Sequence, residues 1–145
     1  MNALNILSYQ DSFLVTNADT WISGGFEEIS NSAPNTICAL EMEDSNRYGT
    51  LHLDAGRVTK FLEKEESAVN EASFINAGLC HLAPEIFKHF KENTNFSLEK
   101  EIFPNLASSG LLFAKTINSY FIDIGIPEDY YKFCKWIEGG KTGAI

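Results

Sequence analysis

The chain has 145 residues, of which 44% are hydrophobic and 21% charged, as in a single globular domain rather than a disordered segment. Its formal net charge of −9 argues against a nucleic-acid partner, because binding to a phosphate backbone needs a basic face. No apolar run is long enough to cross a bilayer, and no basic, apolar signal region follows Met1. We therefore expect one cytoplasmic domain over residues 1–145, without a membrane partner.

Strand patterns dominate the chain. Runs of β-branched and aromatic residues predict strands at 12–17, 36–42, 48–54, 57–63, 74–82, 111–117 and 120–124. The residues Asp54-Ala55-Gly56-Arg57 between two of these runs predict a hairpin turn. The expected fold class is therefore α/β, with a mixed and mostly β sheet.

Three helices are predicted, beginning at Pro84, near Ser97 and at Pro127. Proline is tolerated at the first helical position because its missing N–H would have no partner there. In the last helix an apolar stripe is expected, and Gly139-Gly140 should end it. The residues of that stripe are Tyr130, Phe133, Cys134 and Ile137.

Two apolar strands each deliver an aspartate near their end. Asp19 follows the run Phe13–Thr16, and Asp123 ends the run that begins at Tyr120. Carboxylates on rigid strand ends suit Mg²⁺, which takes one or two protein carboxylates and keeps several waters. The alternative is an aspartate of an ordinary turn, or one at a strand end before a helix, because aspartate is common in both places.

Other polar residues stand at strand ends or interrupt apolar runs, and each also has an ordinary explanation. Glu63 and Lys64 end a strand but begin a charge run that also suits an exposed loop. Asn76 and Gly78 interrupt the strand 74–82, where a glycine usually marks a bulge. Glu99 stands in a first helical turn, where acidic residues are generally favoured.

The sequence offers no catalytic nucleophile. Cys38, Cys80 and Cys134 lie in apolar segments without paired metal-ligand spacing, so we expect buried, reduced thiols. No Ser-His-Asp or Cys-His arrangement suggests covalent catalysis, and no residue is assigned as catalytic.

An ordered series of motifs carries a family resemblance. It runs through Phe13 to Thr20, Arg47 to Thr50, Val58 to Lys64, Phe74 to Gly78, Ser97 to Pro104 and Phe121 to Tyr130. With these motifs the chain resembles the sugar-1-phosphate nucleotidyltransferases, in particular the branch acting on heptose, mannose or N-acetylmuramate phosphates. The resemblance implies a Rossmann-like, glycosyltransferase-A-like nucleotidyltransferase domain, truncated to its C-terminal half. Residues 2–7 resemble a helix from the middle of that fold, which would be a fourth helix.

The resemblance also implies roles for individual residues. Asp19 and Asp123 match the two aspartates that hold Mg²⁺ in the family. The residues that match positions binding the sugar phosphate are Gly49, Glu63, Lys64, Asn76 and Glu99. Two departures from the family pattern are Ala18, where a glycine is usual, and Glu65-Glu66, where a proline usually follows the lysine.

The family's glycine-rich loop, with its Arg and Lys, does not occur in this sequence. We therefore expect the chain alone to be inactive, with Mg²⁺ bound only if another chain completes the nucleotide site. Complemented in that way, it would transfer a nucleotidyl group to a sugar 1-phosphate. The alternative is a non-catalytic oligomeric relative that at most binds a sugar phosphate. Either way, strand 12–17 would lack its usual neighbour, and we expect it to pair with a second copy in a homo-oligomer.

Overall fold

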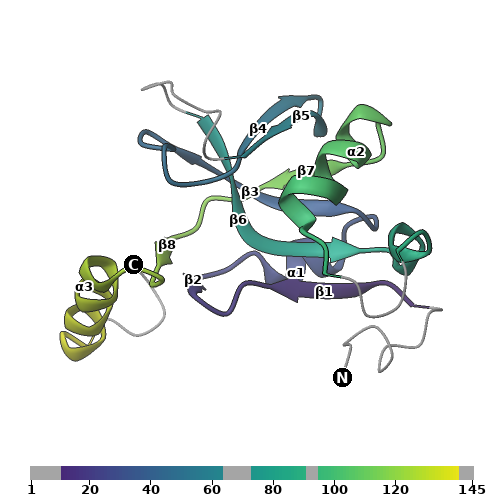
Figure 1. Cartoon of the computed structure of the whole chain (residues 1–145). Helices are drawn as coiled ribbons and strands as arrows, with labels where there is room; N and C mark the ends of the chain where they lie inside the picture. Colours follow the sequence, from purple (N-terminus) through teal and green to yellow (C-terminus); the bar gives the residue numbers. More distant parts are fainter. Residues whose placement is uncertain (1–10, 64–72, 91–94, 141–145) are drawn as a thin grey trace.

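The computed structural model describes residues 11–63, 73–90 and 95–140. Figure 1 shows a sheet with helices on both faces and one helix set apart at its side. The predicted helix at residues 2–7 and the predicted site residue Lys64 lie outside the described residues. In the described part, no helix is both long enough and apolar enough to span a bilayer.

Six strands form the main sheet. They are β1 (Phe13–Thr16), β3 (Thr36–Met42), β4 (Thr50–Asp54), β5 (Arg57–Leu62), β6 (Ser73–Leu82) and β7 (Phe113–Thr116). Their order is β1-β6-β3-β7-β5-β4, and β4 pairs again with β6, so that the sheet curls back on itself. In the part of the chain that the structure describes, only β3 and β7 pair in parallel, and the other pairings of this sheet are antiparallel. This confirms the predicted mixed, mostly β sheet.

The predicted hairpin turn joins β4 to β5. Asp54 pairs with Arg57, and the two residues between them, Ala55 and Gly56, have φ of 47° and 81°. Two central residues with positive φ define the type I′ turn, whose twist matches that of the flanking strands.

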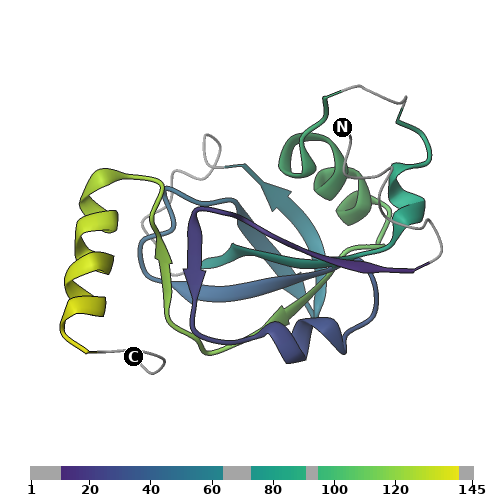
Figure 2. The ribbon, with the colours of Figure 1, turned by 90° about the horizontal axis from the view of Figure 1, so that it is seen from below.

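One strand of a second, two-stranded sheet was predicted, at residues 120–124, but its partner strand and one short helix were not. The antiparallel pair consists of β2 (Thr20–Ile22) and β8 (Phe121–Asp123), which lie side by side next to α3 in Figure 2. The helix α1 (Phe26–Ser30) buries Ile29 completely against the sheet. Elements of three and five residues are too short to show a period in the sequence, and packing rather than propensity stabilises them.

The other helical elements begin where expected. A single 3₁₀ turn, η2 (Pro84–Phe87), replaces the helix predicted at Pro84. A π-helical turn, η3 (Leu98–Ile102), runs into α2 (Phe103–Ser108). Ser97 caps η3, because its Oγ accepts a hydrogen bond from the N–H of Lys100 at 3.1 Å. The last helix, α3 (Pro127–Glu138), ends at Gly139 as predicted.

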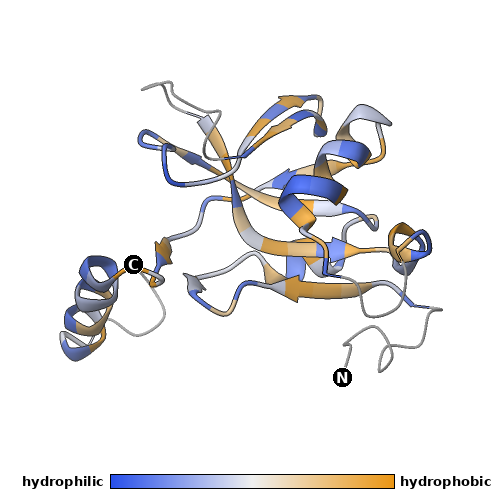
Figure 3. Ribbon diagram, in the orientation of Figure 1, coloured by the Kyte–Doolittle hydropathy of each residue, from blue (hydrophilic) through white to orange (hydrophobic). Residues whose placement is uncertain are grey.

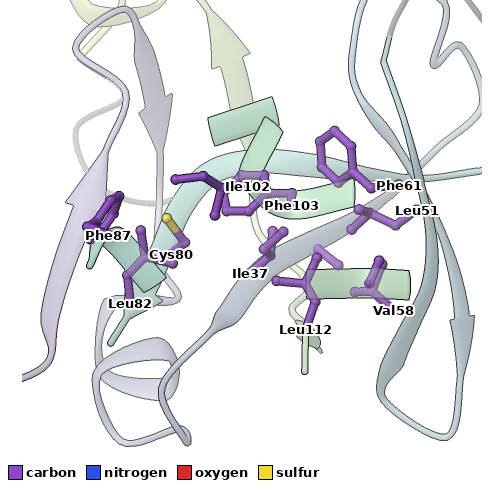
Figure 4. Close-up of a cluster of buried hydrophobic side chains, with 12 residues drawn as sticks. Ile37, Leu51, Val58, Phe61, Cys80, Leu82, Phe87, Ile102, Phe103 and Leu112 are labelled. Atoms are coloured by element: carbon purple, nitrogen blue, oxygen red, sulfur yellow. The ribbon is translucent and has the colours of Figure 1, made fainter. Parts of the chain in front are cut away.

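The core lies on both faces of the sheet. Alternate residues of β3 face opposite sides, so that Ile37 and Ala39 join one hydrophobic cluster while Cys38 and Leu40 join the other. The larger cluster is covered by η2, η3 and α2, and includes the side chains drawn in Figure 4. The smaller cluster includes Ile29 of α1 and Ile22 of β2.

The cysteines agree in part with the expectation of buried thiols. Cys38 and Cys80 are buried and free, and burial raises the pKa of each thiol to about 12. A thiol with that pKa stays protonated and unreactive at neutral pH. Cys134 is free but only half-buried.

The apolar face of α3 differs from the predicted stripe. Phe133 and Trp136 pack against Trp21 of β2, with ring centroids 5.8 and 4.6 Å from the centroid of the Trp21 ring. Tyr130 and Ile137, which were expected on the packed face, remain 49% and 40% exposed. The position of Trp21, which the periodicity of the helix does not reveal, decides which face is covered.

Strand β1 lies at the edge of the sheet. Within the described residues it pairs only with β6, and Figure 3 shows it as a mainly hydrophobic strand. Unpaired edges of apolar strands tend to associate, so this edge is compatible with the predicted homo-oligomer through residues 12–17. The oligomer itself stays a prediction. Sedimentation at micromolar concentration is expected to show a homodimer or a larger assembly. Leu14→Lys, which places a charge on this edge, should dissociate it. A monomer at that concentration would contradict the prediction.

Candidate functional site

The two predicted aspartates meet at one point of the fold. Asp19 lies in the turn between β1 and β2, and Asp123 is the last residue of β8. Pairing of β2 with β8 sets Thr20 opposite Asp123, and the N–H of Ile124 donates to the backbone oxygen of Asp19 at 2.8 Å. A Cβ added to Gly125 would lie 3.0 Å from Asp123 Oδ1 and 3.2 Å from Asp19 Oδ2. Both carboxylates therefore converge on the same small space.

Three of the predicted sugar-binding residues also lie together. Asn76 Nδ2 donates a hydrogen bond to Glu99 Oε1 at 3.0 Å, and its backbone N–H donates to the oxygen of Gly49 at 2.9 Å. The Oδ1 of Asn76 accepts from the N–H of Gly78 at 3.1 Å. These bonds fix the amide of Asn76 and orient the carboxylate of Glu99 beside it.

A pocket of about 110 Å³ joins the aspartates to this group. Its described lining consists of Asn17, Asp19, Thr20, Arg47, Tyr48, Gly49, Asn76, Glu99, Phe121 and Asp123. A neighbouring pocket of about 260 Å³ is more apolar, with Val15, Leu98 and Phe103 in its wall. The two pockets share Asn17, Asn76 and Glu99. We call these three residues the polar seam: it separates the smaller, acidic pocket from the larger, more apolar pocket.

Glu63 stands apart from this group. It follows β5 and forms an ion pair with Lys100, with Nζ and Oε1 3.2 Å apart. It is not among the described residues that line either pocket. Its neighbour Lys64, with Glu65 and Glu66, lies outside the described residues, so the predicted role of the Glu63-Lys64 pair stays a prediction.

The alanine at position 18 causes no backbone strain. In the described part of the chain, the non-glycine residues with positive φ are Asn35 and Ala55. The turn that carries Asp19 therefore does not need the left-handed conformation that favours glycine.

Sequence reasoning missed five residues of the described pocket lining, of which Asn17 and Arg47 make contacts that shape the site. Asn17 packs against Gly78, whose φ of 72° belongs to a bulge in the pairing of β6 with β3. Arg47 Nη2 donates to Asp123 Oδ2 at 3.2 Å, and Nη1 donates to Asp129 Oδ2. The only signal in the sequence was their place inside or beside motifs that were already noted.

The charges at this end of the pocket are partly paired. The hydrogen bond to Asp129 raises the pKa of Arg47 above its usual value. Hydrogen bonds from Lys132 and then Arg47 hold the pKa of Asp129 below its usual value. Burial raises the pKa of the Tyr48 hydroxyl, so that it stays protonated at neutral pH.

The donor set fits Mg²⁺ in the manner of nucleotide sites. Mg²⁺ is usually held by one or two carboxylates together with waters and substrate phosphates, not by a closed protein cage. Asp19 and Asp123 supply two carboxylates aimed at one space. No group of three or more potential His, Cys, Asp or Glu ligands occurs among the described residues.

A family model described as Nucleotidyl transferase matches residues 1–138. The chain belongs to the nucleotidyltransferase family. It is 32% identical over 127 residues to the mannose-1-phosphate guanylyltransferase catalytic subunit beta of Xenopus tropicalis, a match that covers 83% of this chain and 34% of the relative. It is also 32% identical over 123 residues to the D-glycero-alpha-D-manno-heptose 1-phosphate guanylyltransferase of Campylobacter jejuni, covering 82% of this chain and 53% of that one. The family expected from the motifs is thus confirmed, and this nucleotidyltransferase chain spans about a third to a half of these curated relatives.

Solved structures of the nucleotidyltransferase family show the same fold. HddC from Yersinia pseudotuberculosis superposes with a TM-score of 0.71 at 32% identity, covering 87% of this chain and 55% of that one. A putative glucose-1-phosphate thymidylyltransferase from Bacillus anthracis superposes with a TM-score of 0.73 at 16% identity, covering 89% and 55%, which shows the fold alone. The predicted α/β nucleotidyltransferase fold is confirmed.

Proposed function

We propose that these 145 residues form the sugar-phosphate side of a sugar-1-phosphate nucleotidyltransferase. The observation that carries the proposal is the convergence of Asp19 and Asp123 beside the hydrogen-bonded pair Asn76 and Glu99, in one pocket. The names of the relatives, mannose-1-phosphate and heptose 1-phosphate guanylyltransferases, support a sugar 1-phosphate as the acceptor.

In the proposed reaction an oxygen of the sugar phosphate attacks the α-phosphorus of a nucleoside triphosphate. A new P–O bond forms, the bond from the α-phosphorus to the bridging oxygen breaks, and pyrophosphate leaves with the electron pair. Because little covalent chemistry falls to the protein, positioning and electrostatic stabilisation supply most of the rate.

The residues of the pocket divide this work. Asn76 and Glu99 offer oriented acceptors and donors to sugar hydroxyls, and their mutual bond keeps them in place before the sugar arrives. The resemblance assigns the backbone of Gly49 to the sugar, and it assigns the side chain of Lys64, which lies outside the described residues, to the sugar's phosphate. Asp19 and Asp123 would hold Mg²⁺, which supplies charge neutralisation at the reacting phosphates when bound.

Departure of pyrophosphate also needs donors and positive groups around the β- and γ-phosphates. The glycine-rich loop that provides them in the family does not occur in these 145 residues. We therefore propose that turnover requires a nucleotide-binding half in addition to the residues described here.

Pyrophosphate release tests the proposal directly. A polypeptide of these 145 residues, given nucleoside triphosphates and a panel of sugar 1-phosphates that includes mannose 1-phosphate, is expected to release none. Addition of the N-terminal half of a guanylyltransferase relative is expected to restore release. Asp123→Asn should then lower the rate at least about 100-fold, the scale of losing one preorganised electrostatic contact to the transition state.

Asp54→Asn, an exposed carboxylate in the β4–β5 turn, is the matched control and should leave the rate unchanged. Release by the 145 residues alone would contradict the need for a second half. Restored release that Asp123→Asn leaves intact would contradict the proposed role of Asp123.

A further inference from the structure

Arg47 joins two segments that are far apart in the sequence. It lies in the loop between β3 and β4, and its two terminal nitrogens donate to Asp123 at the end of β8 and to Asp129 in the first turn of α3. One guanidinium thus ties a proposed cation ligand to a helix that has no buried residue of its own.

Arg47 is the single cationic side chain among the described residues that line the smaller pocket. Three carboxylates, those of Asp19, Glu99 and Asp123, line the same space. The Arg47 side chain is 41% exposed at the rim, with its guanidinium carbon 5.6 Å from the centroid of the Tyr48 ring. In this conformation the guanidinium of Arg47 forms an ion pair with the carboxylate of Asp123.

A divalent cation at Asp19 and Asp123 would therefore stand close to the guanidinium. Asp123 Oδ1 already accepts a hydrogen bond from the N–H of Gly125 at 2.9 Å, and Oδ2 is the atom that Arg47 contacts. Repulsion between an arriving cation and Arg47 weakens cation binding, because like charges close together repel even at the dielectric constant of water. Asp129, whose side chain is only 13% exposed, still holds the other nitrogen.

We propose that Arg47 competes with the cation of this site: it pairs with the Asp123 carboxylate before a cation binds, gives that carboxylate up to the cation, and stays attached to α3 through Asp129. The inference rests on the proposed function only in taking Asp123 as a cation ligand. Arg47 is distinct from the residues assigned to the sugar and its phosphate, since its contacts are to Asp123 and to α3.

The inference can be tested without turnover by titrating the chain with Mn²⁺ alone. The signal of free Mn²⁺ in electron paramagnetic resonance gives the dissociation constant. Asp123→Asn is expected to remove the tightest binding. Arg47→Gln, which deletes the competing charge, should tighten it about five-fold, the equivalent of about 1 kcal/mol. Arg47→Lys keeps the charge and should bind Mn²⁺ like the original chain. Arg57→Gln, a charge removed elsewhere in β5, should change nothing.

The outcomes separate this inference from the proposed function. If Asp123→Asn leaves Mn²⁺ binding unchanged, the cation site fails and the inference falls with it. If Asp123→Asn removes binding but Arg47→Gln leaves it unchanged or weaker, the inference alone is overturned.

Tighter Mn²⁺ binding in Arg47→Gln could also result from loosening of α3 rather than from removal of the charge. Asp129→Asn frees α3 from Arg47 while the guanidinium stays, so Mn²⁺ affinity should not rise. The two tryptophans of the chain, Trp21 and Trp136, face each other between β2 and α3, so their fluorescence reports the docking of the helix. A rise in Mn²⁺ affinity in Asp129→Asn equal to that in Arg47→Gln would overturn the inference.

Discussion

Replacement of Gly78 by alanine is expected to destabilise the fold by about 2–4 kcal/mol, through two separate effects. Gly78 has a φ of 72°, a conformation that a residue with a Cβ adopts only under strain. The added Cβ would also lie 2.7 Å from Nδ2 and 2.8 Å from Cγ of Asn17. Because β6 is the strand that pairs with β1, β3 and β4, a shift there reaches most of the sheet.

Gly140→Ala is the matched control for the Gly78 substitution. Its φ of 73° is nearly the same, but nothing lies within 4 Å of the position of an added Cβ. It should therefore cost only about 1 kcal/mol, the contribution of the backbone conformation. Urea unfolding of both variants gives the difference, which we assign to the contact with Asn17. Equal losses would contradict that assignment.

The double variant tests the contact itself. Asn17→Ala removes the two atoms closest to the new Cβ, so Asn17→Ala combined with Gly78→Ala should lose less stability than the sum of the two single changes. The same contact has a functional consequence, because Asn17 lines both pockets at the polar seam. A displaced Asn17 changes the shape of the site even where the fold survives.

The sequence predicted those parts of the fold that repeat a pattern over many residues. Strands β3, β5 and β6 each contain β-branched or aromatic residues over six residues or more, with long buried runs in β3 and β6. The turn before Arg57 carries its own signal in Gly56. Strand β2 and helix α1 gave no such signal. They depend on packing of Trp21 against α3 and of Ile29 against the sheet, which are contacts between distant segments.

The residues of the site likewise divide into those that a local sequence pattern predicts and those that depend on contacts between distant segments. The places of Asp19 and Asp123 in the pocket could be predicted because Asp19 follows an apolar run closely and Asp123 ends one. Those of Arg47 and Asn17 could not. The contacts of Arg47 depend on the approach of β8 and α3 to the β3–β4 loop, and those of Asn17 depend on the bulge at Gly78. Periodicity within one segment carries no information about either.

Replacement of Phe103 by alanine is expected to have the largest effect on stability, about 3–5 kcal/mol. The Phe103 side chain is 2% exposed, and its ring centroid lies 5.3 Å from that of Phe61 in β5. It stands where η3 passes into α2, so it holds the helical layer on the sheet. A loss of this size is a large fraction of the 5–15 kcal/mol that usually separates folded from unfolded domains.

Phe26→Ala makes the same chemical change at the start of α1, where the side chain is 47% exposed. It should cost less than about 1 kcal/mol, because little apolar surface is returned to water. Urea unfolding of the two variants compares a buried ring with an exposed one. Since Phe103 also lines the larger pocket, its loss should open the apolar end of the site as well. Similar losses for both variants would mean that the layer of η3 and α2 does not form the core described here, and that the larger pocket lacks a fixed wall.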